Sequence, residues 1–371
     1  MSTLKVNTIR HTGASSDAIT LAADGTAAIG ECTANITNSV SDTNLLINPH
    51  MQINQRGSGT LTVNSSTGQY PVDRWVSRGE GGSRDFTVQQ ISVADQGLGV
   101  RNCVKITSSQ AGTVTANDIF NFRQMIEGYN TQRLNLGESG CASMTLSFTA
   151  RSSVAGTHSG AIQNSAQNKS YPFTYTLAAN TWADIKITIP PITSGSFNEE
   201  NGVGLRVIFD MGSGDNFRGT ANQWNSAHDE GATGAVRILE TNGATWEITK
   251  VQLEEGTIKS PTQKRSYGDE LSRCKRYYFQ FGGSTDETNR FIIEGYTKST
   301  SYSLLSHIDY TMRAAPTVTK TSGWAENNVG SVSFNYRDSN QCAIRLIANA
   351  NDTCCFAHTD ADSYLKFDAE I

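Results

Sequence analysis

Aromatic, amide and acidic side chains gather in one polar stretch of the sequence, between Gly212 and Gly234. The stretch contains Asp215, Asn216, Phe217, Asn222, Gln223, Trp224, Asn225, His228 and Asp229. Proteins hold sugars by packing an aromatic face against the apolar side of the ring, while amides and carboxylates bond the hydroxyls. The composition therefore predicts a glycan-binding loop. The alternative is that Trp224 begins a strand and packs inward. Inward packing is also what their β contexts predict for Trp75, Trp182 and Trp246.

Trp324 is a second tryptophan with a polar setting. It lies in Ser322-Gly323-Trp324-Ala325-Glu326-Asn327-Asn328, near the C-terminus. Binding residues concentrate on exposed loops, so we count this side chain as a further candidate for contact with a sugar. The predicted ligand-binding residues are Trp224, Asn216, Asp215, Phe217 and Trp324.

The motifs of common enzyme classes are missing from the sequence. There is no Gly-x-Ser-x-Gly elbow, no His-Glu-x-x-His helix and no Gly-x-x-x-x-Gly-Lys phosphate loop. Two acidic pairs, Glu199-Glu200 and Glu254-Glu255, are adjacent, so on a strand their side chains point to opposite faces and cannot form an acid/base pair. We expect a protein without catalytic residues.

Candidate metal ligands lie close together near the C-terminus: Cys354, Cys355, His358, Asp360 and Asp362. Neighbouring cysteines on a strand point apart, so both thiols cannot easily reach one zinc ion. Tyr364 stands where a calcium loop needs an acid or an asparagine. The pattern favours two packed thiols followed by a solvated turn. We therefore predict no metal and no cofactor.

The charge and hydropathy patterns argue against two classes of partner. The 371 residues carry a formal net charge of −5 without a long run of Lys or Arg, whereas nucleic-acid binding needs a basic footprint. No window approaches the ~18 uninterrupted apolar residues of a membrane span. The first residues, 1–7, lack the apolar region of a secretory signal. We expect neither nucleic-acid binding nor membrane insertion.

The cysteines indicate the redox compartment, and the length indicates the number of domains. Seven scattered cysteines, an odd number, favour free buried thiols from a reducing compartment over a disulfide framework. A chain of this length suits two or three domains and can bury a core without disulfides.

Short runs with strand character dominate the middle of the chain. They lie at 60–63, 86–91, 103–107, 143–148, 171–177, 183–189, 205–209, 235–239 and 245–251. Repeated alternation with turns at regular spacing is typical of an antiparallel two-sheet sandwich or jelly roll. The predicted fold class is therefore all-β, with a jelly-roll domain over 46–258. A short helix is also considered at 120–129.

Three further segments complete the expected organisation. Residues 1–45 contain two short β-like pieces, 4–9 and 18–21, but too few apolar residues for a core; we expect an arm for assembly or docking, with Leu4, Val6 and Ile9 as its contacts. Residues 259–280 form a connector with an amphipathic helix from Tyr267 to about Tyr278, capped by Ser266 with Asp269 three residues later. Residues 281–371 return to strands and predict a smaller β domain, part of whose core a trimer interface could supply.

Four segments, taken in order, resemble tail-fibre-type proteins of marine and cyanobacterial bacteriophages. Residues 1–9 resemble the attachment segment of those fibres. Residues 44–57 with Asp73-Arg74-Trp75 resemble the beginning of their carbohydrate-binding-module-like domain. Residues 251–256 and the helix through Cys274-Lys275-Arg276-Tyr277-Tyr278 resemble the end of that domain, and residues 312–319 are similar to a strand in their C-terminal part. The chain departs from the pattern at 260–264, where a more apolar stretch is expected.

The resemblance implies a virion structural protein of jelly-roll type. Such a protein would be made in the host cytoplasm, form a homotrimer, dock to another tail or head protein through residues 1–45, and contact host-surface glycan. Two alternatives stay open: a purely structural appendage, such as a head fibre or tail adaptor, and a depolymerase that cleaves surface polysaccharide.

Overall fold

The computed structural model describes residues 8–9, 19–21, 27–29, 43–57, 59–64, 67–81, 84–283, 291–335, 337–359 and 363–371. The chain divides into two compact units, Met1–Asp42 and Thr43–Ile371. In the first unit, β1 (Thr8–Ile9), β2 (Ile19–Leu21) and β3 (Ala27–Ile29) pair as one antiparallel sheet. Strand β3 was not expected from the sequence. Of the three predicted contact residues, Leu4 and Val6 lie outside the described residues, and Ile9 is in β1.

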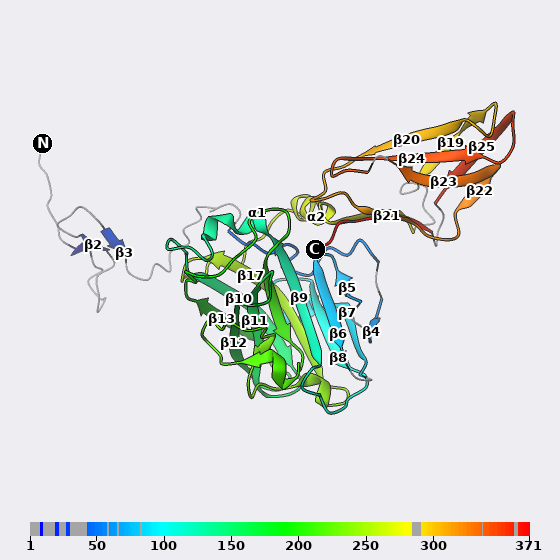
Figure 1. Cartoon of the computed structure of the whole chain (residues 1–371). Coiled ribbons are helices and arrows are strands. Elements are labelled where there is room, and N and C mark those ends of the chain that lie inside the picture. Colours follow the sequence, from blue (N-terminus) through cyan, green and yellow to red (C-terminus); the bar gives the residue numbers. More distant parts are fainter. Residues whose placement is uncertain are drawn as a thin grey trace, which may run out of the picture. The chain divides into compact units, whose positions relative to one another are not determined.

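The larger unit contains a sandwich of two six-stranded antiparallel sheets, which confirms the predicted all-β fold class (Figure 1). Sheet I has the order β13-β10-β17-β8-β7-β4 and sheet II the order β12-β11-β14-β9-β6-β5. The strands of sheet I are β4 (Leu61–Val63), β7 (Phe86–Ser92), β8 (Asn102–Ser108), β10 (Met144–Ser152), β13 (Ala183–Ile189) and β17 (Thr245–Glu255). Those of sheet II are β5 (Gln69–Val72), β6 (Trp75–Glu80), β9 (Ile119–Glu127), β11 (Gly156–Asn164), β12 (Ser170–Leu177) and β14 (Val203–Asp210).

Aromatic rings from both sheets fill the space between them. The ring centroids of Trp75 and Phe122 are 5.2 Å apart and stacked, and the ring of Trp246 lies 5.4 Å from that of Phe209. Trp75 and Trp246 are fully buried, as predicted. The prediction for Trp182 was wrong: its indole is partly exposed, lies under the guanidinium of Arg151 and donates to the side chain of Gln96.

Two local predictions in the sandwich were also wrong. The helix considered at 120–129 is mostly strand β9, because Phe120 and Phe122 face the core and alternate with polar residues that face outward; only α1 (Gly128–Thr131) follows it as a helix. The strand expected at 235–239 gives way to a 3₁₀ turn, Ile238–Glu240. The carbonyl of Ala235 accepts a hydrogen bond from Arg218, so it is not available to a neighbouring strand.

Helix α2 (Tyr267–Lys275) begins at the predicted cap. The Ser266 side chain accepts a hydrogen bond from the Asp269 amide at 3.2 Å. The helix ends three residues before Tyr278, which instead begins strand β18 (Tyr278–Gly282). Tyr267 is 57% exposed, so it does not belong to the buried face, whereas Cys274 is fully buried. No helix in the described part of the chain is both long and apolar enough to span a membrane.

Residues 44–57, called here the opening segment, pack against the end of β17 and against α2. Leu45 donates its amide to the carbonyl of Leu253, and the Asn44 side chain bonds both Val251 and Leu253. Glu270 of α2 accepts a hydrogen bond from the Asn48 amide at 2.6 Å. The first and last parts of the sandwich are therefore joined by hydrogen bonds rather than merely adjacent.

The remaining strands form three small antiparallel sheets, ordered β18-β26-β21, β19-β25-β22 and β20-β24-β23. Their bounds are β19 (Ile292–Thr297), β20 (Ser303–Asp309), β21 (Thr317–Lys320), β22 (Ala325–Asn327), β23 (Val329–Asn335), β24 (Gln341–Ala348), β25 (Thr353–His358) and β26 (Tyr364–Asp368). They share a core built around Phe279, Phe367 and Leu346. On β25, Cys354 is exposed and Cys355 buried, so the two thiols point apart as expected. Asp360 and Asp362 lie outside the described residues.

We predict that Asn48→Ala destabilises the protein by about 3 kcal/mol, because it strips several buried backbone groups of partners at once. The Asn48 side chain accepts from the amides of Gln52 and Ile53 and donates to the carbonyls of Ile53 and Asp73. Urea denaturation measures the change. Asn242→Ala, at an exposed turn, is the matched control and should change the free energy of unfolding by less than about 0.5 kcal/mol. Equal effects of the two variants would contradict the prediction.

Candidate functional site

The outer face of sheet II, which points away from the core, is lined by polar side chains. Strand pairing places Asn121 of β9 between Arg78 of β6 and Asp210 of β14. Two residues further along β9, Arg123 lies beside Ile208, and two further again Met125 pairs with Arg206. These positions share one face because side chains alternate along a strand. We call Arg78, Arg123 and Arg206 the arginine face.

Residues 211–234 lie over part of this outer face and bury it. Strand β16 (Gly231–Ala232) contacts β11, β12 and β14 and pairs in parallel with β15 (Arg218–Gly219). Gly231 has to be glycine, because a Cβ there would overlap the side chains of Asp210 and Ser159. This close approach brings the polar stretch singled out in the sequence onto sheet II.

A buried ion pair fixes this stretch in place. The guanidinium of Arg218 lies 2.6 Å from a carboxylate oxygen of Asp210, and both side chains are almost fully buried. The other oxygen of Asp210 accepts hydrogen bonds from the amides of Gly212 and Ser213. Because a buried carboxylate is stable only when it is paired and hydrogen-bonded, this arrangement determines where the stretch leaves β14.

Glu230 supplies a negative charge next to the arginine face. It is 1% exposed, accepts a hydrogen bond from the Asn121 amide nitrogen at 2.8 Å and lies 2.8 Å from Nε2 of His228. Burial alone would raise the pKa of Glu230, but the His228 contact, the charge of Arg123 and the Asn121 hydrogen bond lower it overall. Glu230 is thus held as a carboxylate, in line with the rule that hydrogen bonds to the charged form favour it.

The arginines differ in how far their donors are satisfied. Arg206 donates to the carbonyls of Asn164 and Ser165, and burial together with the charge of Arg123 lowers its pKa to about 10. Arg78 forms an ion pair with Glu80. Arg123 is 8% exposed, and its Nε has no hydrogen-bond partner among the residues that the structure describes. The face therefore has donor capacity to spare at its centre.

Of the residues predicted to bind a ligand, Phe217 lies nearest to this face. Its ring packs edge-on against His228 with 4.9 Å between centroids, and its carbonyl accepts the amide of Glu230. Asp215 is 80% exposed and pairs with Arg237, while Asn216 donates to Asn117. The structure connects Phe217 to the Glu230 network and gives Asp215 and Asn216 other partners.

The two tryptophans are placed elsewhere. Trp224 is partly exposed, packs 5.5 Å from Tyr171 and donates its indole nitrogen to the carbonyl of Pro190. Trp324 is only 8% exposed; its indole donates to the carbonyl of Tyr364 and its ring lies 5.9 Å from Phe291. Trp324 does lie in a loop just before β22, but its ring belongs to the C-terminal core and offers a ligand little area, contrary to the predicted contact with a sugar.

Sequence reasoning missed the arginine face together with Asn121 and Glu230. Only part of the signal was present: aromatic and polar residues alternate over Phe120-Asn121-Phe122-Arg123, which is typical of a strand with one polar face. It was overlooked because the same stretch was interpreted as a helix.

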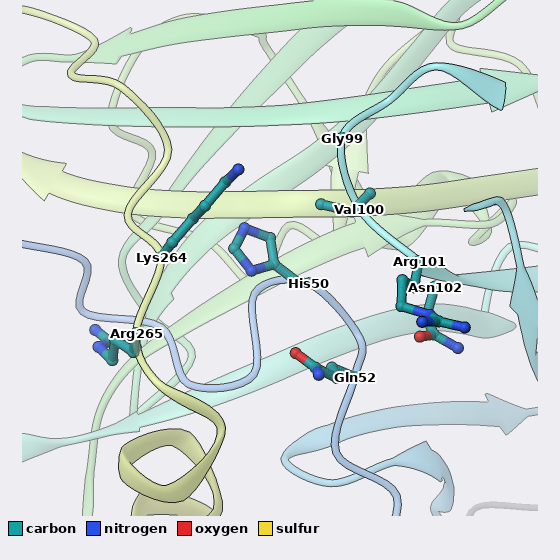
Figure 2. Close-up of a pocket in the computed structure, with 8 residues that line it drawn as sticks. All are labelled: His50, Gln52, Gly99, Val100, Arg101, Asn102, Lys264 and Arg265. Atoms are coloured by element: carbon teal, nitrogen blue, oxygen red, sulfur yellow. The ribbon is translucent and has the colours of Figure 1, made fainter. Parts of the chain in front are cut away.

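A cavity of about 200 Å³ lies on another part of the sandwich, where three segments meet (Figure 2). His50 of the opening segment lies between Lys264 and the loop at 99–102. Its Nε2 has no hydrogen-bond partner in the described part of the chain. Burial and the charges of Lys264, Lys250 and Arg265 lower the pKa of His50 to about 4. Because no Trp, Tyr or Phe lines this cavity, it lacks the ring that sugar packing needs.

We predict that His50 makes stability fall with acidity. In the unfolded chain His50 binds a proton near pH 6.5, whereas in the folded protein it stays neutral down to about pH 4. Between these values the unfolded state binds more protons, so the free energy of unfolding decreases as the pH falls, by about 1–3 kcal/mol. Urea denaturation at pH 7.5 and pH 4.5 should show a smaller decrease for His50→Gln than for the wild type. The same decrease in both proteins would contradict this assignment.

No family model and no curated protein matches the sequence. Several solved structures show partial similarity to this chain at low identity. The enzymatically active domain of tailspike protein 4 from bacteriophage CBA120 is similar over 57% of this chain with 12% identity and a TM-score of 0.30; the match spans about a fifth, 21%, of that solved chain. A family 11 carbohydrate-binding module of a Clostridium thermocellum cellulase is similar over 55% of this chain and 99% of its own length, with 13% identity and a TM-score of 0.26. The CBM22-1 xylan-binding domain from Paenibacillus barcinonensis matches 54% of this chain and 95% of its own, with 7% identity and a TM-score of 0.24.

Proposed function

We propose that this chain is a non-enzymatic fibre-type appendage protein of a bacteriophage particle, and that its sandwich binds host-surface glycan on the outer face of sheet II. The observation that carries the binding proposal is the combination on that face of buried, partly unsatisfied polar groups with an adjacent aromatic ring. Arg123 and Asn121 each have a polar atom without a hydrogen-bond partner among the described residues, and Phe217 lies next to the same network through His228 and Glu230.

The chemistry of these groups suits a sugar. A pyranose presents hydroxyls that both donate and accept, together with an apolar face that packs on a ring. The part of the Arg123 guanidinium that stays exposed can donate to a sugar oxygen, and so can the less buried guanidiniums of Arg78 and Arg206. Phe217 is partly exposed and available for packing. A shallow site of this kind would bind each sugar weakly, so several copies on one particle would raise the effective concentration.

The virion part of the proposal is supported by the order of four sequence segments. Residues 1–9, 44–57, 251–278 and 312–319 resemble tail-fibre-type proteins in the same order. Two of these segments, 44–57 and 251–278, are hydrogen-bonded to each other in the fold. Because these two segments together close the sandwich, we take the resemblance to extend to the arrangement of domains. The proposal therefore includes a homotrimer and a docking arm at residues 1–45.

Phe217→Ala should weaken binding of the fluorescently labelled full chain to host-surface polysaccharide by roughly three- to tenfold, the range expected for one aromatic contact. The matched control is Phe356→Ala, because Phe356 also packs against a histidine, His358, but on β25. Binding titrations on immobilised polysaccharide measure both. New reducing ends in the same samples would support the depolymerase alternative, and no binding by any form would favour the purely structural one.

Removal of residues 1–42 should abolish incorporation into particles while leaving glycan binding intact. The deletion stops at Asp42 because Asn44 and Leu45 hydrogen-bond to β17 and belong to the sandwich. Immunoblotting of purified particles checks incorporation, and light scattering gives the number of chains per assembly. Particles that still carry the shortened protein would contradict docking through the arm. A full-length protein that is monomeric in solution would contradict the proposed trimer.

A further inference from the structure

The arginine face concentrates positive charge on a protein that is acidic as a whole. The chain has a formal net charge of −5, yet the guanidiniums of Arg78, Arg123 and Arg206 share one sheet face with the carboxylates of Glu80 and Glu230. Three positive charges against two negative ones leave an excess of one, before His228 is considered. The two carboxylates offset part of the repulsion among the guanidiniums, and one positive charge on this face stays unbalanced.

The three arginines lie at regular intervals across the sheet. Arg78 pairs with Asn121, which is two residues before Arg123 on β9; Arg206 pairs with Met125, which is two residues after it. Each step therefore moves by one strand and two residues. With strands about 4.8 Å apart and a rise of about 3.3 Å per residue, each step is roughly 8 Å and the whole row roughly 16 Å. That length suits an extended chain with repeated charges better than a single small ion.

The centre of the row has unfilled hydrogen-bonding capacity. Nε of Arg123 and Oδ1 of Asn121 are buried and lack partners among the described residues, and these two side chains are 8% and 0% exposed. A buried polar group without a partner destabilises a protein. Asn121 is fully covered, so a ligand would meet the row at its guanidiniums: an oxyanion would accept from the part of Arg123 that stays exposed and from the less buried Arg78 and Arg206.

Repulsion among the three arginines also favours an anionic ligand. Burial and the nearby charge of Arg123 lower the pKa values of both Arg78 and Arg206. A bound anion would relieve this repulsion. Guanidinium is also the side-chain group best shaped to hold a carboxylate or a sulfate through two parallel hydrogen bonds.

We infer that the arginine face selects an anionic glycan, whose sugars carry carboxylate or sulfate groups at intervals along the chain. This inference rests on the proposed function, because it names the class of sugar bound at the same face. Arg123 is the central binding residue, and Arg78 and Arg206 bind the charges on either side.

The test compares two pairs of polymers with the full-length protein. Polygalacturonate carries carboxylates, and its fully methyl-esterified form has the same backbone without charge; dextran sulfate and dextran form the corresponding sulfate pair. We expect at least tenfold tighter binding to a charged polymer than to its neutral partner, with an affinity that falls as salt rises. If the difference appears in the polygalacturonate pair, the anion is a carboxylate; if it appears in the dextran pair, the anion is a sulfate.

Three variants assign the effect to the face. Arg123→Gln and Arg206→Gln should each reduce binding of the charged polymer at least fivefold, and Arg123→Lys should keep part of it. Arg345→Gln, which removes the same charge from β24 in the C-terminal sheets, should leave binding unchanged. Thermal unfolding of each variant shows whether it is folded; Arg206 is the less buried of the two sites, so Arg206→Gln remains informative if Arg123→Gln unfolds.

Each other outcome has a distinct meaning. Equal binding of charged and neutral polymers, unaffected by the arginine variants, would overturn the anionic class and leave glycan binding intact. Charged polymers bound equally well by Arg206→Gln and Arg345→Gln would overturn the role of this face. If host polysaccharide and all four polymers fail to bind, the proposed function itself fails.

Discussion

The buried side chain of Asn48 is the point on which the closure of the sandwich depends. Its side-chain amide bonds four backbone groups in the opening segment and in the turn before β6. Its backbone N–H donates to Glu270 of α2, and its backbone carbonyl accepts from the indole of Trp75. Its φ of 56° is one that asparagine tolerates better than most residues. One residue thus joins the first segment, the aromatic core and the connector helix.

The outer face of sheet II is also organised by buried polar groups that find partners in hydrogen bonds and ion pairs. Asp210 and Arg218 neutralise each other and hold residues 211–234 against the strands. Glu230 is carried on that segment and meets Asn121 from β9. The segment therefore covers one side of the face and leaves the other side with arginines whose donors are only partly used. The residues that anchor the segment therefore also determine which side of the proposed binding face remains open.

The fold was more predictable from the sequence than the site was. Eight of the nine strands expected in the middle region formed, because each buries one side against a common core, whereas the sandwich strands β5, β6, β9 and β11 were not predicted as strands. Capping chemistry located the start of α2 at Ser266. The arginine face was not predictable in this way, since it arises when β6, β9 and β14, distant in sequence, become neighbours. Trp324 shows the opposite error: a polar sequence context suggested exposure, but contacts from Phe291 and Tyr364 bury the ring.

The final residues of the chain have a mechanical consequence. The C-terminal sheets follow the sandwich through Tyr277, whose hydroxyl bonds Glu127, and they end near the same place, where the amide of Ala369 donates to Tyr277 and Glu370 pairs with Arg74. Two anchor points, one covalent and one electrostatic, resist twisting better than a single flexible linker can. A pull or torque on the C-terminal sheets would therefore be passed directly to β6 and β9, the strands that carry Arg78 and Arg123.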